Sequence, residues 1–455
     1  MLLILDIGTS SMRGLLIDLQ GNIRKKIQRS YTLTCLPDGG VEMEMEKLDR
    51  ALWECLQRMG DFCTEEGVTL EGISVTSQRS SVIPMGPDGR AQGNALMWQD
   101  RRCARLLEKQ QPGSREIYEI CGMRLSPVMS APKMGYMKEH MPDLYDRAVK
   151  LIGFQEYVLH WLTGVYATDT SIASRTGLYD LKKDRWSREL LDRFGVAEKK
   201  LCPLVPVGSV VGETAGSVNG LLRTGRNVPV VSAGGDQQCA VLGMKCGDGN
   251  DMICNMGTGA YVIALTDHPV IDNRMRVNCN VSAVRGKWIL EGMVLNAGTT
   301  LDWLCALFYG HLTKEEALKE LIAEAKASET GARGLHFKNA LTGTGTPAWD
   351  TQVRAEFTGI ELRHQREDFV RAGLEGVIRD VAACAKSVED LLDTPCTAVR
   401  VAGGLSKSEW IVDLLSEQLQ KPVCVAAQRE ATGLGAFLSG MKALHMQTES
   451  IADGL

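Results

Sequence analysis

The side chains best suited to chemistry in this sequence follow short apolar runs. A run from Val228 leads through two glycines to Asp236, and the residues after it have a helical pattern, so the carboxylate is expected where a strand gives way to a helix. A second run, Met252–Cys254, ends in Gly257-Thr258-Gly259. Backbone at two glycines can approach a ligand closely, and consecutive N–H groups form an anion-binding concavity. The sequence therefore predicts an acid and a phosphate-binding loop near each other.

A similar arrangement stands at the start of the chain. An apolar run from Leu2 ends in Asp6, and Gly8-Thr9-Ser10-Ser11 follows. A lone Gly-Thr-Gly is more often a turn than a phosphate site, but here the loop is repeated. A β-hairpin is expected after each loop. The first would pair strands over 12–18 and 23–31, and the second would pair strands over 260–265 and 276–284. The repeat indicates two similar domains that each offer a phosphate loop to a shared cleft.

Composition and charge argue against several classes of protein. The 455 residues, 44% of them hydrophobic, can bury a large core and favour two or three domains. A net charge near −5 does not support a nucleic-acid-binding surface. The sequence has no apolar run of about eighteen residues, so neither a membrane span nor a signal peptide is expected. The 14 cysteines are scattered without metal-binding spacing, which is typical of reduced thiols in a cytoplasmic protein.

A polar patch is expected at the end of a strand over 72–76, which follows an amphipathic helix over 46–66. Arg79, Trp98 and Asp100 fall in this patch. The indole could form an apolar wall, and the charged groups could bind the hydroxyls of a hydrophilic ligand. The alternative is a solvated loop with one anchored tryptophan.

The rest of the chain supplies the elements that must position these groups. The segment 100–200 is interpreted as an insertion, largely helical up to residue 163, that roofs the cleft, and the hinge between the halves is expected over 205–230. A strand over 399–402 opens through Gly403 and Gly404 into a helix over 409–419. That glycine turn could let the backbone pass flat against a nucleoside base, or it could be a simple strand-to-helix turn.

Together these blocks resemble the FGGY family of carbohydrate kinases over nearly the whole chain. The motifs that carry the resemblance are Asp6-Ile-Gly-Thr-Ser-Ser, Gly234-Gly-Asp-Gln, Gly257-Thr-Gly and Val401-Ala-Gly-Gly. The resemblance implies an α/β fold of two actin-like ATPase (ribonuclease-H-like) domains, 1–235 and 236–455, with an interdomain cleft. It also implies ATP and Mg²⁺ as cofactors, a small polyol or sugar as substrate, and a homodimer. Within the family, the motifs are most similar to those of glycerol kinases.

The resemblance also implies roles for individual residues. Asp236 would be the base that takes the proton from the substrate hydroxyl, and Asp6 together with Asp236 would help to hold Mg²⁺, Asp6 acting through the metal's water shell. The substrate would contact Arg79, Ser80, Trp98, Asp100, Val128, Asp236 and Gln237. The nucleotide would contact Thr9, Ser10, Ser11, Arg13, Gly257, Thr258, Gly259, Gly298, Asp302, Gly403, Gly404 and Ser408.

Three positions depart from the glycerol kinase pattern. Those enzymes have Glu where this chain has Ser80, Tyr where it has Val128, and usually Asn where it has Ser408. Because two groups that contact glycerol are replaced by smaller side chains, we expect a longer polyol or a pentose- or hexose-class sugar as substrate. A divergent glycerol kinase is the alternative within the family. An actin-like ATPase without a sugar substrate is the alternative from another class.

Overall fold

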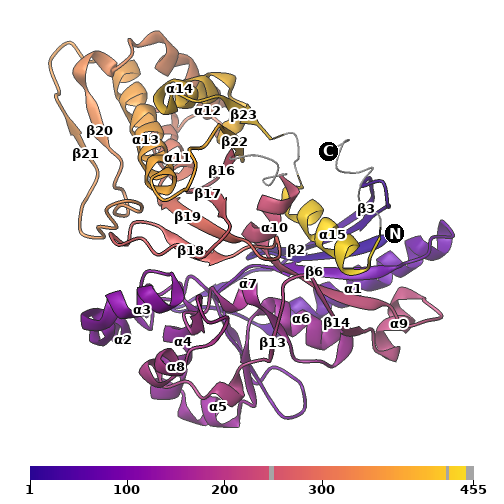
Figure 1. Ribbon diagram of the computed structural model, residues 1–455. Helices are drawn as coiled ribbons and strands as arrows, with labels where there is room; N and C mark the ends of the chain where they lie inside the picture. Colours follow the sequence, from indigo (N-terminus) through magenta and orange to yellow (C-terminus); the bar gives the residue numbers. More distant parts are fainter. Residues whose placement is uncertain (245–250, 427–429, 447–455) are drawn as a thin grey trace.

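The computed structural model describes residues 1–244, 251–426 and 430–446, and these residues contain two six-stranded sheets (Figure 1). The first sheet has the order β14-β15-β6-β1-β2-β3 and the second the order β18-β19-β17-β16-β22-β23. The first consists of β1 (Leu2–Ile7), β2 (Ser11–Ile17), β3 (Ile23–Ser30), β6 (Gly72–Ser77), β14 (Ser209–Glu213) and β15 (Pro229–Gly235). The second consists of β16 (Asp251–Met256), β17 (Ala260–Thr266), β18 (Asn278–Val281), β19 (Trp288–Val294), β22 (Ala398–Ala402) and β23 (Val423–Val425).

The two sheets share a pattern of pairing. In the first, β1 pairs antiparallel with β2 and parallel with β6. In the second, β16 pairs antiparallel with β17 and parallel with β22. The inference of two similar halves, drawn from the repeated strand and Gly-Thr loop, is therefore confirmed by the topology.

Helices cover both sheets, and short strands complete the connections. The helices are α1 (Met45–Glu65), α2 (Ala104–Gln110), α3 (Ser114–Cys121), α4 (Ser130–His140), α5 (Pro142–Arg147), α6 (Phe154–Thr163), α7 (Thr170–Ala173), α8 (Arg188–Phe194), α9 (Gly216–Leu222), α10 (Asp236–Gly243), α11 (Gly298–Tyr309), α12 (Lys314–Ala327), α13 (Arg366–Glu389), α14 (Glu409–Leu419) and α15 (Ala431–Ala443). The short strands are β4 (Thr34–Cys35), β5 (Val41–Met43), β7 (Ile83–Met85), β8 (Ala95–Leu96), β9 (Lys150–Ile152), β10 (Thr168–Asp169), β11 (Tyr179–Asp180), β12 (Arg185–Trp186), β13 (Leu204–Val205), β20 (His336–Lys338) and β21 (Glu356–Thr358). Among the described residues, none of these helices is long and apolar enough to cross a membrane.

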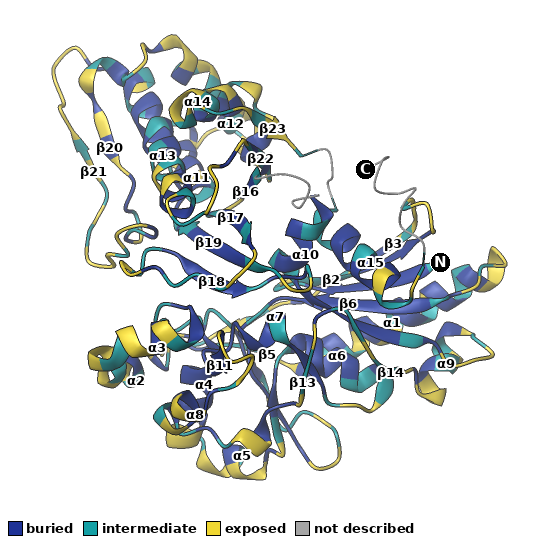
Figure 2. Cartoon of the chain, viewed as in Figure 1, coloured by how far each residue is buried: buried dark blue, intermediate teal, exposed yellow. Residues whose placement is uncertain are grey.

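The first sheet is buried on both faces, which explains why β1 is a continuous apolar run. Leu3 and Leu5 pack in a cluster with Leu48 and Leu52 of α1. Their neighbours on the opposite face, such as Ile4, pack in another cluster with residues of α15. Figure 2 shows the middle strands of both sheets as mostly buried, whereas edge strands such as β3 and β23 are largely exposed.

Helix α10, which begins at Asp236, is held against the first sheet by α15. The two helices cross so closely that a Cβ on Gly243 would lie 1.9 Å from the Ala431 carbonyl oxygen. A Cβ on Gly435 would lie 1.7 Å from the Cys239 carbonyl oxygen. Only glycine fits at such contacts. The last helix of the described chain therefore packs on the first sheet and fixes the helix that carries Asp236.

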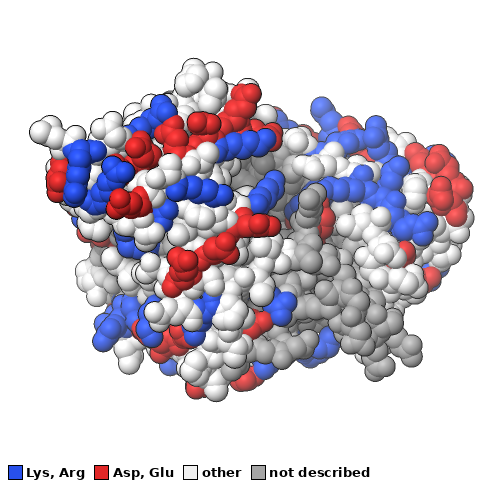
Figure 3. Space-filling view, turned by 90° about the horizontal axis from the view of Figure 1, so that it is seen from above, with Lys and Arg blue, Asp and Glu red and all other residues white. Residues whose placement is uncertain are grey.

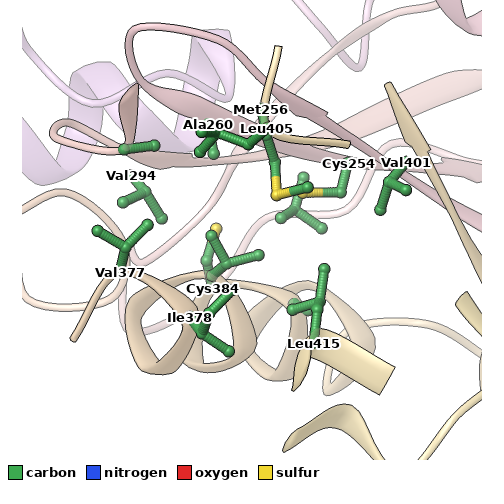
Figure 4. Close-up of a cluster of buried hydrophobic side chains, with 14 of the residues drawn as sticks. Cys254, Met256, Ala260, Val294, Val377, Ile378, Cys384, Val401, Leu405 and Leu415 are labelled. Carbon is green, nitrogen blue, oxygen red and sulfur yellow. The ribbon is translucent and has the colours of Figure 1, made fainter. Parts of the chain in front are cut away.

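The core of the second half lies between its sheet and helices α13 and α14. Figure 4 shows Cys254 of β16 and Val401 of β22 facing Cys384 of α13 and Leu415 of α14. All four side chains are fully buried. Burying an aliphatic side chain of this size contributes about 1.5–3 kcal/mol, so this layer holds the sheet rigidly under the second Gly-Thr loop.

The structure corrects two sequence-based expectations about the connections. The hairpin predicted over 260–265 and 276–284 does not form, because β17 pairs with β19 and β18 lies outside β19 at the sheet edge. The hinge predicted over 205–230 is also wrong. Those residues form β14 and α9, and β14 pairs with β15 inside the first sheet. The connections to the second half fall after Met244 and after Ala426.

The insertion predicted over 100–200 is confirmed as a mainly helical block that contains α2–α8 and packs beside the first sheet (Figure 1). Its backbone also contacts β18 of the second half, where the Cys279 N–H donates to the Gly122 carbonyl oxygen at 2.8 Å. On the face seen in Figure 3, basic and acidic side chains lie in small mixed groups, so neither sign of charge dominates it.

Candidate active site

The register of the first sheet brings three loops to one edge. Ile7 of β1 lies beside Ser77 of β6, and Ser77 lies beside Gly235 of β15, all in parallel pairs. The residues that follow these strands therefore leave the sheet side by side. In doubly wound sheets, ligands bind at the carboxyl ends of parallel strands. This register places the Gly8-Thr9 loop, Arg79 and Asp236 together, as the sequence predicts.

Hydrogen bonds connect the first phosphate loop to the predicted substrate side. The Trp98 indole Nε1–H donates to Thr9 Oγ1 at 3.1 Å. The Thr9 hydroxyl in turn donates to Gln78 Oε1 at 3.4 Å. Trp98 is thus anchored to the loop through its polar edge, and its ring is oriented by that contact.

Asp236 belongs to a chain of ion pairs. Its Oδ1 lies 3.2 Å from Arg79 Nε, and Arg79 NH1 lies 3.2 Å from Glu291 Oε2. The other oxygen of Glu291 lies 2.9 Å from Arg175 NH1. Burial raises the pKa of Asp236 above its usual value, and the positive charge of Arg79 opposes that shift. The side chain of Asp236 is 27% exposed, so water reaches the carboxylate and reduces the cost of its charge.

Glu291 is the buried centre of this ion-pair chain. Burial alone would raise the pKa of its carboxyl group, but Arg175 and Arg79 together bring the pKa below its usual value. Glu291 is therefore ionised at neutral pH, although only 2% of its surface is exposed. Its β19 strand belongs to the second sheet, whereas both arginines belong to the first half.

Asp6 lies close to the same group of charges. Its carboxylate is buried and forms an ion pair with Arg13. The pKa of Asp6 is raised to about 6, mainly by burial and in part by the negative charge of Asp236, and the positive charge of Arg13 opposes this shift. Arg13 NH1 also lies 2.9 Å from Glu430. Two carboxylates therefore hold the guanidinium at the mouth of the first phosphate loop.

The second phosphate loop packs on the start of α11. The Gly257 N–H donates to the Gly259 carbonyl oxygen at 2.9 Å, and the Gly298 N–H donates to the Gly257 carbonyl oxygen at 2.9 Å. A Cβ on Gly298 would lie 2.6 Å from that carbonyl oxygen. Thr258 at the tip is exposed. The loop is thus a tight turn whose tip faces solvent beside a helix N-terminus, which suits a phosphate.

The third glycine turn lies beside the second loop. Asn255 of β16 pairs with Ala402 of β22 in parallel, so the loops after both strands leave the same edge of the second sheet. Gly403 has φ +96°, and a Cβ there would lie 2.4 Å from the Met256 carbonyl oxygen. Ser408 lies after this turn and directly precedes α14, which begins at Glu409. The sequence-predicted nucleotide residues of the second half, apart from Asp302, are therefore close together.

Family models identify both halves of the molecule. The N-terminal domain of the FGGY family of carbohydrate kinases matches residues 1–243, and the C-terminal domain of that family matches residues 252–444. The chain belongs to the FGGY family of carbohydrate kinases. The two-domain, actin-like α/β fold and the ATP-dependent carbohydrate kinase activity expected from the sequence are thereby confirmed. An actin-like ATPase without a carbohydrate substrate loses its support.

Individual FGGY kinases match over almost their full length. A glycerol kinase from Alteromonas mediterranea is 29% identical over 462 residues, which cover 97% of this chain and 90% of that protein. A gluconokinase from Bacillus subtilis is 25% identical over 447 residues, which cover 96% of this chain and 86% of that protein. The crystal structure of xylulose kinase from Lactobacillus acidophilus has a TM-score of 0.92 at 24% identity, covering 100% of this chain and 92% of that chain.

The two substrate-side positions at which this FGGY kinase departs from glycerol kinases, Ser80 and Val128, lie in a well-packed region. Ser80 is buried, adopts φ +71°, and its hydroxyl donates to the Arg175 carbonyl oxygen at 3.2 Å. A cavity of about 20 Å³ adjoins Ser80 and is lined also by Glu156 and Thr176. It is large enough for about one water molecule. Val128 is half-buried in a loop whose carbonyl groups accept hydrogen bonds from the Lys133 ammonium, at 3.0 Å for Val128 itself.

Two sequence-predicted residues are engaged elsewhere. The Asp100 carboxylate accepts hydrogen bonds from the backbone N–H of Val41 and from the backbone and guanidinium of Arg102. Asp302 is exposed on α11 and forms an ion pair with Lys314 at 2.7 Å. The substrate role of Asp100 and the nucleotide role of Asp302 stay predictions. The backbone N–H of Gln237 donates to Asp236 Oδ1 at 2.7 Å, and the Ser11 hydroxyl accepts from Gln28 at 3.3 Å.

Sequence reasoning missed three residues beside Asp236. Glu291 and Arg175 complete the ion-pair chain. The third is Tyr261 of β17, whose pKa is raised by burial and by the negative charges of Glu291 and Asp236. Glu291 could have been found from its position, because it is an acid at a buried position of an otherwise apolar strand. A buried carboxylate of this kind needs a positively charged or hydrogen-bonding partner.

Proposed function

We propose that this FGGY kinase transfers the γ-phosphoryl group of Mg-ATP to a hydroxyl of a four- to six-carbon polyol or sugar, with Asp236 as the general base. The proposal is carried mainly by the position of Asp236. Its carboxylate leaves the same sheet edge as the first phosphate loop and remains 27% exposed. A base must reach both water-accessible substrate and the neighbourhood of the phosphates, and this position supports that role.

Phosphoryl transfer requires positioning and charge neutralisation more than covalent chemistry. Asp236 would accept the proton of the attacking hydroxyl, and Arg79, 3.2 Å away, would hold that carboxylate and the reacting end of the substrate. The Gly8 and Gly257 N–H groups donate within their own turns. The other N–H groups and the threonine hydroxyls of the Gly8-Thr9 and Gly257-Thr258-Gly259 loops would bind the phosphates. Each half would thus supply one part of the phosphate site.

The residues present fit a magnesium ion that is held with the nucleotide. Within the described part of the chain, no three acidic, histidine or cysteine side chains gather as a metal site. Mg²⁺ in kinases usually has one or two carboxylate ligands, several waters and the substrate phosphates. Asp6 and Asp236, which influence each other's charge, would be those carboxylates. The ion would neutralise charge on the transferring phosphoryl group.

The substrate class follows from Ser80 and Val128. In a site that pairs every hydroxyl, each missing partner costs roughly 1–3 kcal/mol. Loss of both groups would weaken a glycerol-sized ligand by about 2–6 kcal/mol if nothing replaced them. The relatives named above as gluconokinase and xylulose kinase support a substrate longer than glycerol for this chain as well. A divergent glycerol kinase remains the second candidate, favoured by the glycerol kinase match.

The test is kcat/KM for glycerol against a panel of four- to six-carbon polyols, ketoses and sugar acids. We expect a longer compound to exceed glycerol by at least about tenfold, which corresponds to 1.4 kcal/mol. If glycerol is the best substrate, the divergent glycerol kinase is correct. The double variant Ser80→Glu with Val128→Tyr should shift preference toward glycerol, and each single variant serves as its control. No shift in the double variant would mean that these positions do not contact the substrate.

A further inference from the structure

One carboxylate of the second sheet reaches into the catalytic group of the first half. Glu291 lies on β19, opposite Ile263 of β17. Its two carboxylate oxygens accept hydrogen bonds from Arg79 NH1 at 3.2 Å and from Arg175 NH1 at 2.9 Å. These arginines come from sequence positions 212 and 116 residues away. Glu291 is therefore the link between the two halves at the site.

Arg79 connects this link to the proposed base. Its NH1 group faces Glu291, while its Nε group faces Asp236 at 3.2 Å. A guanidinium is planar and rigid, so fixing one edge fixes the direction of the other. Glu291, together with the neutral Gln238 Oε1 that accepts from the same NH1 group at 3.3 Å, thus directs how Arg79 meets Asp236. An unpaired buried carboxylate costs several kcal/mol, so this arrangement is favourable only while both arginines are in place.

The same region also holds the two halves together. The Val281 N–H of β18 donates to the Ser174 hydroxyl at 3.2 Å, and Asn280 Oδ1 accepts from Arg175 NH1 at 3.1 Å. Separation of the halves at this interface would withdraw Glu291 from both arginines. The orientation of Arg79 is therefore tied to the contact between the halves.

We propose that Glu291 is a positioning residue that aligns Arg79 with Asp236 only while the two halves are in contact. The inference deepens the proposed function and depends on it for the role of Asp236. Without Glu291, the Arg79 NH1 group keeps only the neutral Gln238 Oε1 as an acceptor, at 3.3 Å. The guanidinium can then turn further toward Asp236 and neutralise the base. Asp236 can therefore act as a base only while the two halves are in contact. This arrangement reduces phosphoryl transfer to water when the halves are apart.

The main test is Glu291→Gln, which keeps size and an acceptor oxygen but removes the charge. We expect kcat to fall about 10- to 100-fold, because small misplacements near the reacting atoms have effects of this size, while KM for ATP changes less than about threefold.

Two further variants separate positioning from folding. Glu291→Asp keeps the charge, so it should recover part of kcat even if Glu291→Gln folds poorly. Ser174→Ala removes one hydrogen bond between the halves without touching Arg79. Because the contacts of Arg175 with Asn280 and Glu291 remain, it should lower kcat much less than Glu291→Gln does. In an Arg79→Gln background, Glu291→Gln should have little further effect on kcat, because the residue acts through Arg79.

The proposal is overturned if Glu291→Gln keeps kcat within threefold of the wild type. It is equally overturned if KM for ATP rises as much as kcat falls, or if the effect of Glu291→Gln on kcat adds fully to that of Arg79→Gln. The assay uses whichever polyol or sugar the wild-type enzyme phosphorylates fastest, so an error in the substrate class does not alter the outcome. If Asp236→Asn stayed active, the proposed role of Asp236 as general base would be refuted. The double variant of Glu291 and Arg79 would still measure the coupling between these two residues, so the two proposals can fail independently.

Discussion

Replacing Asp236 with asparagine isolates the proposed chemical step from binding and folding. The amide keeps the shape of the side chain and an oxygen that can accept the 2.7 Å hydrogen bond from the Gln237 N–H. It removes the negative charge and the ability to take a proton. Loss of a general base typically costs about 10² to 10⁴ in rate, which equals about 3–5 kcal/mol in the activation barrier. We therefore expect kcat to fall by that factor.

The structure predicts little change in folding or nucleotide binding for Asp236→Asn. Arg79 keeps its partner Glu291 at 3.2 Å, so it is not left as an unpaired buried charge. The lost pair with the 27%-exposed Asp236 side chain is worth about 1 kcal/mol or less. Reduced repulsion from Asp6 offsets part of that loss, because the two carboxylates raise each other's proton affinity. The unfolding free energy should change by less than about 1 kcal/mol.

The pH dependence gives an independent check on Asp236. Because burial raises its pKa, the wild-type rate should decline on acidification at a pH above the usual range for aspartate. The decline reflects protonation of the base, so the same limb should be absent in the asparagine variant. Steady-state ADP release, ATP binding by calorimetry and thermal melting measure the three quantities. Asp143→Asn, an exposed position on α5, is the charge-matched control. A fall in kcat of less than tenfold with an intact fold would refute the assignment.

Two other changes test the phosphate and metal side. Asp6 has a pKa of about 6, so the Mg²⁺ concentration for half-maximal activity should rise as the pH falls through 6. Asp6→Asn should raise that Mg²⁺ concentration at every pH. An equal Mg²⁺ requirement in the variant and the wild type would contradict the role of Asp6. Gly403→Ala introduces a Cβ 2.4 Å from the Met256 carbonyl oxygen at φ +96°, so it should lower the unfolding free energy by at least about 1 kcal/mol. Gly404→Ala is the control, because a Cβ at Gly404 would have no atom within 4 Å, and it should leave the melting temperature unchanged. Equal melting temperatures for Gly403→Ala and Gly404→Ala would show that the turn tolerates a side chain at Gly403.

Features that depend on local periodicity could be predicted from the sequence. The amphipathic pattern over 46–66 corresponds to α1 (Met45–Glu65), and the strand before Asp236 ends at Gly235. Strand partners could not be predicted in this way. The residues of β18 alternate as plausibly as those of β19, and only packing in the folded sheet places β19 beside β17.

The residues of the candidate site also fall into two groups, those that a local sequence pattern reveals and those that only the folded structure brings together. Asp6, Arg79 and Asp236 are recognisable because each lies at or just after the carboxyl end of a strand, and parallel strands share an edge. Glu291 lies within a strand, and its partners are 116 and 212 residues away in sequence. No local pattern reports such a contact. Asp100 shows the opposite case, since its polar surroundings suggest a ligand but its carboxylate receives N–H groups from Val41 and Arg102.

The position of α15 on the first sheet sets an order of events during protein synthesis. The strands of that sheet are complete once Gly235 has been made, but the helix that covers the face of Leu2 and Ile4 begins at Ala431. About 195 residues lie between them, which takes roughly 10–40 s at typical translation rates of about 5–20 residues per second. During that time the face lacks its cover. The N-terminal half therefore cannot mature as an independent unit on the ribosome, and must wait for the C-terminal half to emerge.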